Sequence, residues 1–251
     1  IEFPATGNAR TLTVESVINF ENDNNNTIRV EDGGDGSLVH TIQAQSDIIN
    51  PSASSSMLLF RDQAKTAIDL EFTGSGSSTV AAFNSESELA LNRIIVNKDN
   101  GQSDLITIDS DFTIGAVTNT STKAVALQSG TLVLNNSGIN IDLTTGGGDF
   151  DIPAAAGLQV TQGQVNVSGD DTGIILDGSL IIDGGTVNMD DAVGNGNNFI
   201  EYSASGNALL QISSGTLDVG SQDRGITTAE TGELRYRQTG GDVRIGTQAG
   251  P

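Results

Sequence analysis

The sequence predicts an all-β fold, a single parallel β-helix (β-solenoid) of about nine coils. Two observations carry this prediction. A ten-residue apolar pattern centred on a glycine occurs five times, and successive copies lie 22 to 33 residues apart. Repeats of this length are typical of solenoids, in which each coil buries its apolar side chains against its neighbours. The chain between the copies has no apolar periodicity of 3.6 residues, so arrays of helical repeats are disfavoured.

The pattern places apolar residues five and three positions before the glycine, and two and four positions after it. Around Gly130 these residues are Val125, Leu127, Leu132 and Leu134. Alternate residues of a strand point to the same face, so each copy predicts two short strands with one inward face. The glycine falls between the strands, where a sharp bend favours a residue that tolerates positive φ. It therefore marks a corner of the coil.

Four further copies extend the pattern towards the C-terminus. They are centred on Gly163, Gly185, Gly215 and Gly241. The last copy begins with Tyr236 and carries the polar Gln238 where the others have an apolar residue. We expect the inward positions to be buried, and they include Leu132, Leu134, Val165, Val167, Val187, Leu217 and Val219.

The first half of the chain fits the pattern less well. Apolar alternation predicts strands within residues 11–20, 27–30, 37–42, 57–60, 67–72, 79–83, 93–97 and 105–114. Ile106, Ile108, Phe112 and Ile114 nearly reproduce the later pattern, with a shorter crossing and no glycine. We therefore predict one solenoid over residues 1–251, with irregular coils in 1–115 and regular, glycine-cornered coils in 116–251. An antiparallel sandwich or propeller is disfavoured, because its strands have no reason to repeat one ten-residue pattern.

The composition limits the classes of partner. Asp and Glu outnumber Lys and Arg by 32 to 11, which gives a formal net charge of −21. Nucleic acids and anionic membrane surfaces are therefore poor partners, whereas cations and cationic surfaces are better ones. No run of 18 apolar residues is long enough to insert into a membrane, and the chain contains no Cys. Aromatic residues make up only 4% of the chain, fewer than an enzyme pocket usually needs.

The run Tyr236-Arg237-Gln238-Thr239-Gly240-Gly241-Asp242-Val243-Arg244-Ile245-Gly246 resembles a repeat of large bacterial surface proteins. These are proteins of the autotransporter-associated β-strand-repeat type, and residues 213–220 look similar to the same unit. The resemblance covers the second half of the chain. It implies a right-handed parallel β-helix in a secreted or surface-displayed bacterial protein, used as a stalk or as an adhesive passenger. It also implies an extracellular location.

Catalytic groups do not form a recognisable set. His40 is the only histidine, so we assign it no role. Asp170 and Asp171 resemble the paired aspartates of polygalacturonase-like glycosidases, but the accompanying Gly-His-Gly and Arg-Ile-Lys are missing, and a turn is the simpler interpretation. A lyase base could come only from a lysine or arginine, and the lysines are Lys65, Lys98 and Lys123. We therefore predict a non-catalytic structural or adhesive module without a cofactor; the alternative is a polysaccharide-binding or polysaccharide-cleaving β-helix.

Residues 144–151 are the segment closest to a calcium-binding repeat. Its third glycine is followed by Asp149 where the motif needs another glycine, and it does not recur every nine residues. A surface turn is the better interpretation, and Ca²⁺ bound to such acidic turns is the alternative.

Four of the eight arginines, Arg224, Arg235, Arg237 and Arg244, lie in the last 28 residues. Arg235 and Arg237 alternate with Leu234 and Tyr236, so we expect them on the outer face. Pairing with acidic neighbours is the simpler interpretation, and a contact patch for an acidic glycan or for another copy is the alternative. We also expect open ends on the stack, so that coils continue in a longer chain or stack end to end with a second copy.

Overall fold

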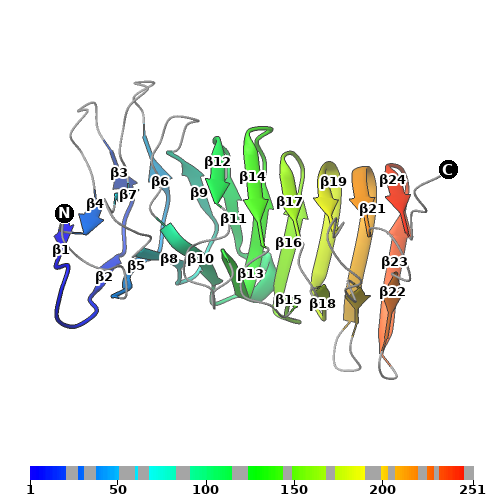
Figure 1. Cartoon of the computed structure of the whole chain (residues 1–251), viewed down its shortest axis with the longest axis horizontal. Coiled ribbons are helices and arrows are strands. Elements are labelled where there is room, and N and C mark those ends of the chain that lie inside the picture. Colours follow the sequence, from blue (N-terminus) through cyan, green and yellow to red (C-terminus); the bar gives the residue numbers. More distant parts are fainter. Residues whose placement is uncertain are drawn as a thin grey trace.

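The computed structural model describes residues 1–20, 28–30, 38–50, 60–61, 68–82, 91–114, 124–143, 149–167, 173–189, 199–202, 207–219, 225–228 and 232–245. These residues form an elongated stack of strands, with the N-terminus at one end and the C-terminus at the other (Figure 1). Every strand pairing among them is parallel, and none of them is α-helical. The predicted all-β parallel solenoid is therefore confirmed.

Most strands belong to one sheet of seventeen strands. They are β2 (Thr11–Val14), β3 (Ile18–Asn19), β5 (His40–Ala44), β6 (Ile48–Ile49), β8 (Ile68–Phe72), β9 (Ser78–Ala81), β10 (Leu91–Asn97), β11 (Leu105–Ile108), β12 (Phe112–Ile114), β13 (Val125–Leu134), β14 (Ile139–Asp142), β16 (Ala156–Val160), β17 (Gln164–Asn166), β19 (Ser179–Asn188), β21 (Asn207–Asp218), β23 (Glu233–Gln238) and β24 (Asp242–Arg244).

Two smaller sheets complete the stack. One holds β1 (Glu2–Phe3), β4 (Ile28–Val30) and β7 (Phe60–Arg61); the other holds β15 (Phe150–Ile152), β18 (Ile174–Leu176), β20 (Ile200–Glu201) and β22 (Ile226–Thr227). A short 3₁₀ helix, η1 (Gly101–Ser103), lies between β10 and β11.

The large sheet wraps around three sides of the stack. The first side holds β2, β5, β8, β10 and the N-terminal part of β13. The second side is a ladder of nine strands, namely β3, β6, β9, β11, β13, β16, β19, β21 and β23. The third side is a ladder of six, namely β12, β14, β17, β19, β21 and β24.

The regular, three-sided part of the solenoid therefore has about six turns, fewer than the nine coils predicted for the whole chain. The difference arises at the N-terminal end. There the second-side ladder continues through β9, β6 and β3, while β1, β4 and β7 form a separate sheet.

The inward positions of the repeat form the core. Leu132, Leu134, Val165, Val167, Val187, Leu217 and Val219 are all buried, as predicted. Those within strands stack on the equivalent position of the next turn; Val187, for example, lies between Val165 and Leu217. The core is thus continuous from turn to turn, as a solenoid requires.

The first copy of the repeat lies on a different corner from the other four. Leu132 and Leu134, which follow Gly130, pair with Leu158 and Val160, which precede Gly163. Gly130 therefore turns the chain from the first side to the second, whereas Gly163 turns it from the second to the third. In the turn before Gly163, residues Asn135 to Gly138 form the corner between the second and third sides. The sequence pattern missed this corner because the segment between its two strands has a different length and its glycine is at a different position.

Gly163, Gly185, Gly215 and Gly241 stack on one another at the second corner. Gly163, Gly215 and Gly241 have φ values of 79°, 80° and 72°, as predicted for a corner. Gly185 does not have positive φ, which corrects the expectation for that residue. It is nevertheless restricted to glycine, because a Cβ there would lie 2.6 Å from the carbonyl oxygen of Gly163. At Gly185, therefore, the close contact between neighbouring turns requires glycine, and the backbone φ does not.

Strands also run through some corners that were predicted to separate two strands. β13 and β19 continue past Gly130 and Gly185, while β16 and β17 are separate on either side of Gly163.

The last turn is less buried than the turns before it. Tyr236 and Ile245 occupy core positions of the pattern, yet 46% and 48% of their surfaces are exposed.

Candidate functional site

His40 is a structural residue in the described part of the chain. It is fully buried in β5, and its ring stacks on Phe3 with 4.8 Å between ring centroids. The backbone N–H of Arg10 donates to Nδ1 (3.1 Å), and Nε2 lies 2.9 Å from the carbonyl oxygen of Pro4. Both ring nitrogens thus bind the N-terminal segment, so the imidazole holds that segment against the first turns.

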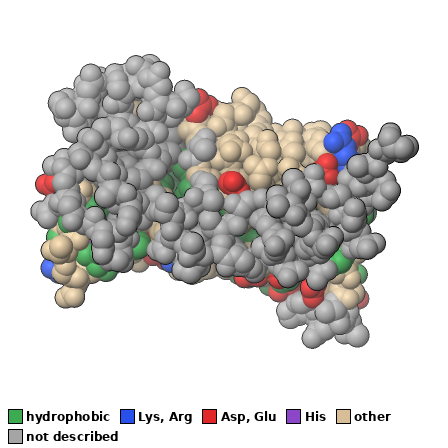
Figure 2. Space-filling view, in the orientation of Figure 1, with side chains coloured by type: hydrophobic (Ala, Val, Ile, Leu, Met, Phe, Trp, Pro, Cys, Tyr) green, Lys and Arg blue, Asp and Glu red, His purple; other side chains and the backbone are tan. Residues whose placement is uncertain are grey.

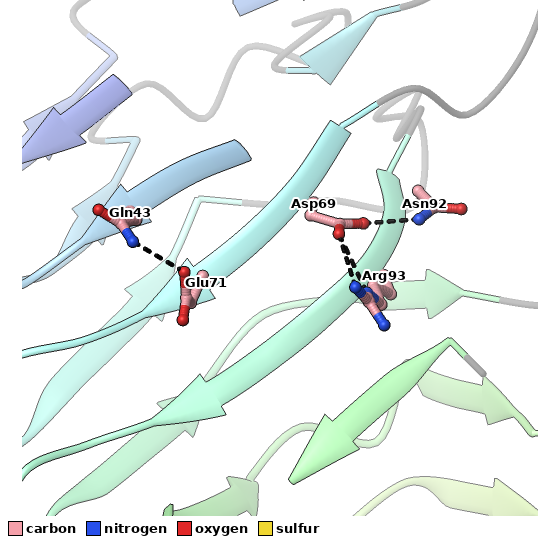
Figure 3. Close-up of polar contacts among 5 residues, drawn as sticks. All are labelled: Gln43, Asp69, Glu71, Asn92 and Arg93. Atoms are coloured by element: carbon pink, nitrogen blue, oxygen red, sulfur yellow. Dashed lines mark hydrogen bonds and ion pairs between the residues drawn. The ribbon is translucent and has the colours of Figure 1, made fainter. Parts of the chain in front are cut away.

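The outer face of β8 carries two carboxylates, Asp69 and Glu71, that sequence reasoning did not single out. Figure 3 shows them two residues apart on one strand, with partners from the neighbouring strands β5 and β10. Glu71 accepts hydrogen bonds from the amides of Gln43 (3.0 Å) and Asn97 (3.1 Å). The signal was available, because alternation in Ile68–Phe72 directs both acids outwards.

Asp69 is the more buried of the two, with 6% of its surface exposed. It accepts a hydrogen bond from Asn92 Nδ2 (2.6 Å) and forms an ion pair with Arg93, whose Nε and Nη2 both lie 3.0 Å away (Figure 3). These contacts connect two turns at a place where the pairing of β8 with β10 is irregular. The two carboxylates therefore connect neighbouring turns by accepting hydrogen bonds from their side chains.

A pair of carboxyl groups on one face is also what a glycosidase uses, with one group as the acid and the other to activate water or the sugar. In this structure both carboxylates already accept hydrogen bonds from amide or guanidinium groups. The acceptor atoms of both carboxylates are therefore engaged in contacts between neighbouring turns.

Lys98 is the one lysine among the described residues, and it points inwards. Only 2% of its surface is exposed, and its Nζ donates to the carbonyl oxygen of Thr73 (2.6 Å). Burial lowers the pKa of Lys98, while the negative charges of Asp104 and Asp99 oppose that shift. The lysine stem passes close to Gly130, where a Cβ would lie 2.9 Å from Lys98 Cγ. Lys98 thus fills the corner and is not accessible to a substrate.

Asp104 stabilises the loop that follows Lys98. Burial by itself would raise the pKa of Asp104. The net shift is nevertheless downward, because Asp104 accepts hydrogen bonds from the side chain and backbone of Asn100 and from the backbone of Gly76, and because Lys98 is positively charged. The bonds from Asn100 Nδ2 measure 3.1 and 3.3 Å. The ionised carboxylate therefore stabilises the turn that presents η1.

Gln102 of η1 crosses the outer surface of the next turns, and we call its contacts the Gln102 clasp. Its Nε2 donates to the carbonyl oxygen of Ala154, its Oε1 accepts from Ser179 Oγ, and its carbonyl oxygen accepts from Thr131 Oγ1, each at 2.9 Å. Gly157 lies in register between Thr131 and Ser179. A Cβ on Gly157 would lie 2.6 Å from Ser179 Oγ, so the clasp needs a glycine there.

Metal ligands do not gather in the described residues: no group of three or more His, Cys, Asp or Glu side chains is placed to hold an ion. Asp149, from the segment tested for calcium binding, accepts a hydrogen bond from the backbone N–H of Gly173 (2.8 Å). Residues 144–148, together with Asp170, Asp171, Lys65 and Lys123, lie outside the described residues.

The arginines of the proposed contact patch lie on different sides of the last turn. Arg235 and Arg237 are exposed on β23, on the second side. Arg244 is on the third side, where its Nη1 lies 3.6 Å from Asp218 Oδ2 in an exposed ion pair. Arg224 lies outside the described residues. The structure thus brings Arg235 and Arg237 together and gives Arg244 an acidic neighbour of its own.

The third side carries uncharged polar groups in two rows. Asn140, Gln164, Thr186 and Thr216 are in register in one row, and Asn166 and Asn188 are in register in the other. We call these six residues the amide–threonine face. Figure 2 shows this part of the surface as a broad tan area, with acidic and basic groups at its rim.

Comparison with protein-family models, curated proteins and solved structures found no match to this chain. The resemblance to autotransporter-associated repeats therefore stays a prediction. Among the described residues no helix is long and apolar enough to cross a membrane.

Proposed function

We propose that the chain is a non-catalytic structural or adhesive module of a secreted or surface-displayed bacterial protein. The observation that carries this proposal is the use of its reactive side chains. His40, Asp69, Glu71 and Lys98 each bind a neighbouring turn or segment through hydrogen bonds. Groups that a catalyst would present to a substrate therefore maintain the stack.

The outer surface supports the same proposal. Stacked turns present straight rows of side chains, which suit a stalk or a surface for adhesion. The absence of Cys and the excess of acidic residues are compatible with an extracellular protein.

The test is incubation of the purified protein with plant, algal and bacterial polysaccharides. Reducing ends and unsaturated sugars are measured over time, and bound protein is measured in parallel. We expect no product with any substrate. Sustained release of either product by the wild-type protein would overturn the proposal.

The second candidate is a polysaccharide-cleaving enzyme, which the side-by-side placement of Asp69 and Glu71 favours. If product is released, the variant Glu71→Gln distinguishes a catalytic carboxylate from a contaminating activity. Asp151→Asn serves as the matched control, because Asp151 is an exposed carboxylate of β15, away from β8. Loss of product with Glu71→Gln alone would assign the reaction to this pair.

A further inference from the structure

We propose that the amide–threonine face binds an uncharged, hydroxyl-rich linear polysaccharide; the proposal rests on the adhesive role above and names its partner. The first argument is chemical. Amide and hydroxyl groups each offer both a donor and an acceptor, as do the hydroxyl groups of a sugar. A face built from Asn, Gln and Thr therefore matches sugar hydroxyls without requiring charge on the ligand.

Charge is the second argument. The six residues of the face are neutral in a chain of net charge −21. Charged groups occur only at the ends of the two rows, where Asp142, Asp218, Asp242 and Arg244 continue the same registers. Three of these four are acidic, so an anionic polymer would be repelled at the rim. The electrostatics thus favour a neutral ligand over a uronate or sulfated one.

The face is also ordered before any ligand arrives. Asn166 is its centre: its Nδ2 donates to Asn140 Oδ1 (3.2 Å), and its Oδ1 accepts from Gln164 (2.6 Å) and Asn188 (3.5 Å). Amides fixed by such bonds lose little conformational freedom on binding. The side chains that carry specificity are therefore held in place by one another.

Spacing provides the last argument. Groups within a row repeat at about 4.8 Å from turn to turn, and the two rows lie about 6.6 Å apart. A regular grid of this kind suits a polymer that repeats along its length. The face has no aromatic residue on which a sugar ring could stack, so each contact is weak. Affinity then comes from many contacts along one chain, and short oligosaccharides bind poorly.

The test uses co-sedimentation with insoluble cellulose, chitin and starch, and with polygalacturonate gel as the charged counterpart. The variant Gln164→Glu with Thr216→Glu places two negative charges on the face. Thr107→Glu with Gln211→Glu is the control, because it adds the same charge at half-buried outward positions of the second side. Thermal unfolding by circular dichroism confirms that both variants remain folded.

We expect the wild-type protein and the control to bind at least one neutral polymer equally, with little dependence on salt, and the face variant to bind at least about tenfold more weakly. No binding to any neutral polymer, or equal loss in both variants, overturns the assignment of this face. Reducing ends are measured in the same supernatants. Their release would contradict the non-catalytic function instead, so the two proposals fail by different observations.

Discussion

Seven of the nine buried polar side chains in the described residues lie before residue 111, whereas the stacked corner glycines all lie after residue 162. In the early turns His40, Asp69 and Lys98 connect neighbouring segments through individual hydrogen bonds. The later turns instead share one stacked glycine corner and continuous apolar rows. The comparison shows that regular stacking replaces specific polar contacts, which are needed where the repeat decays.

The apolar core of the regular turns should give the largest effect when it is disrupted. Leu217→Asp places a charge in a fully buried row, and we expect a loss of about 4–5 kcal/mol in the free energy of unfolding. Ile245→Asp is the control at the exposed end of the same side and should cost less than about 1 kcal/mol. Urea denaturation followed by circular dichroism measures both. Equal losses would show that the last turn is as well packed as the earlier ones.

The glycine corners come next. Gly215→Ala combines positive φ with a clash against the carbonyl oxygen of Gly185, and we expect a loss of about 3 kcal/mol. Gly76→Ala has a similar φ of 86° but no atom within 4 Å of the added Cβ, so it should cost only about 1–2 kcal/mol. The same denaturation experiment isolates the packing contribution. Equal losses of stability in the two variants would show that packing against Gly185 contributes nothing to the requirement for glycine at Gly215.

Among the early turns, the buried carboxylate should matter more than an exposed one. Asp69→Asn removes the ion pair with Arg93 and a charged acceptor for Asn92, at a cost of about 2 kcal/mol. Asp218→Asn weakens the exposed ion pair with Arg244 and should cost less than about 0.5 kcal/mol. If the order of the two losses were reversed, specific polar contacts would not explain the stability of the early turns.

Asp104 predicts a pH dependence for the same region. Its pKa is lowered in the folded state, so the stability it contributes is fully present above the unfolded pKa and is lost as the pH falls through the folded pKa. Asp104→Asn should be less stable at neutral pH, and its stability should then fall less steeply in acid. Denaturation at neutral pH and below the ordinary Asp value of 3.8 compares the two slopes. Identical slopes would contradict the assignment.

The smallest effect concerns the last turn. Tyr236 and Ile245 are exposed where the preceding turns bury the equivalent residues, and Arg235 and Arg237 flank Tyr236 on β23 in a chain of net charge −21. We expect weak end-to-end self-association at low salt that is lost at high salt. Sedimentation velocity at increasing protein concentration measures it, with Arg235→Glu plus Arg237→Glu as the disrupting variant. A monomer at every concentration in low salt would eliminate self-stacking.

Local alternation in the sequence determined the strands, their inward residues and the presence of glycine corners. These features depend only on the geometry of a strand and on backbone freedom, which neighbouring residues encode. The outward direction of Asp69 and Glu71 belongs to the same class, because it follows from the alternation of Ile68–Phe72.

Only the tertiary structure decided which corners stack. Gly130 and Gly163 carry the same local pattern but turn different corners, because register depends on pairing between residues far apart in the chain. The same reason applies to Gln102, which binds Ser179 from 77 positions away, and to Lys98, whose inward position depends on the carbonyl of Thr73 and on the space above Gly130. Local sequence specifies which way a side chain points, but the neighbouring turn determines what it meets.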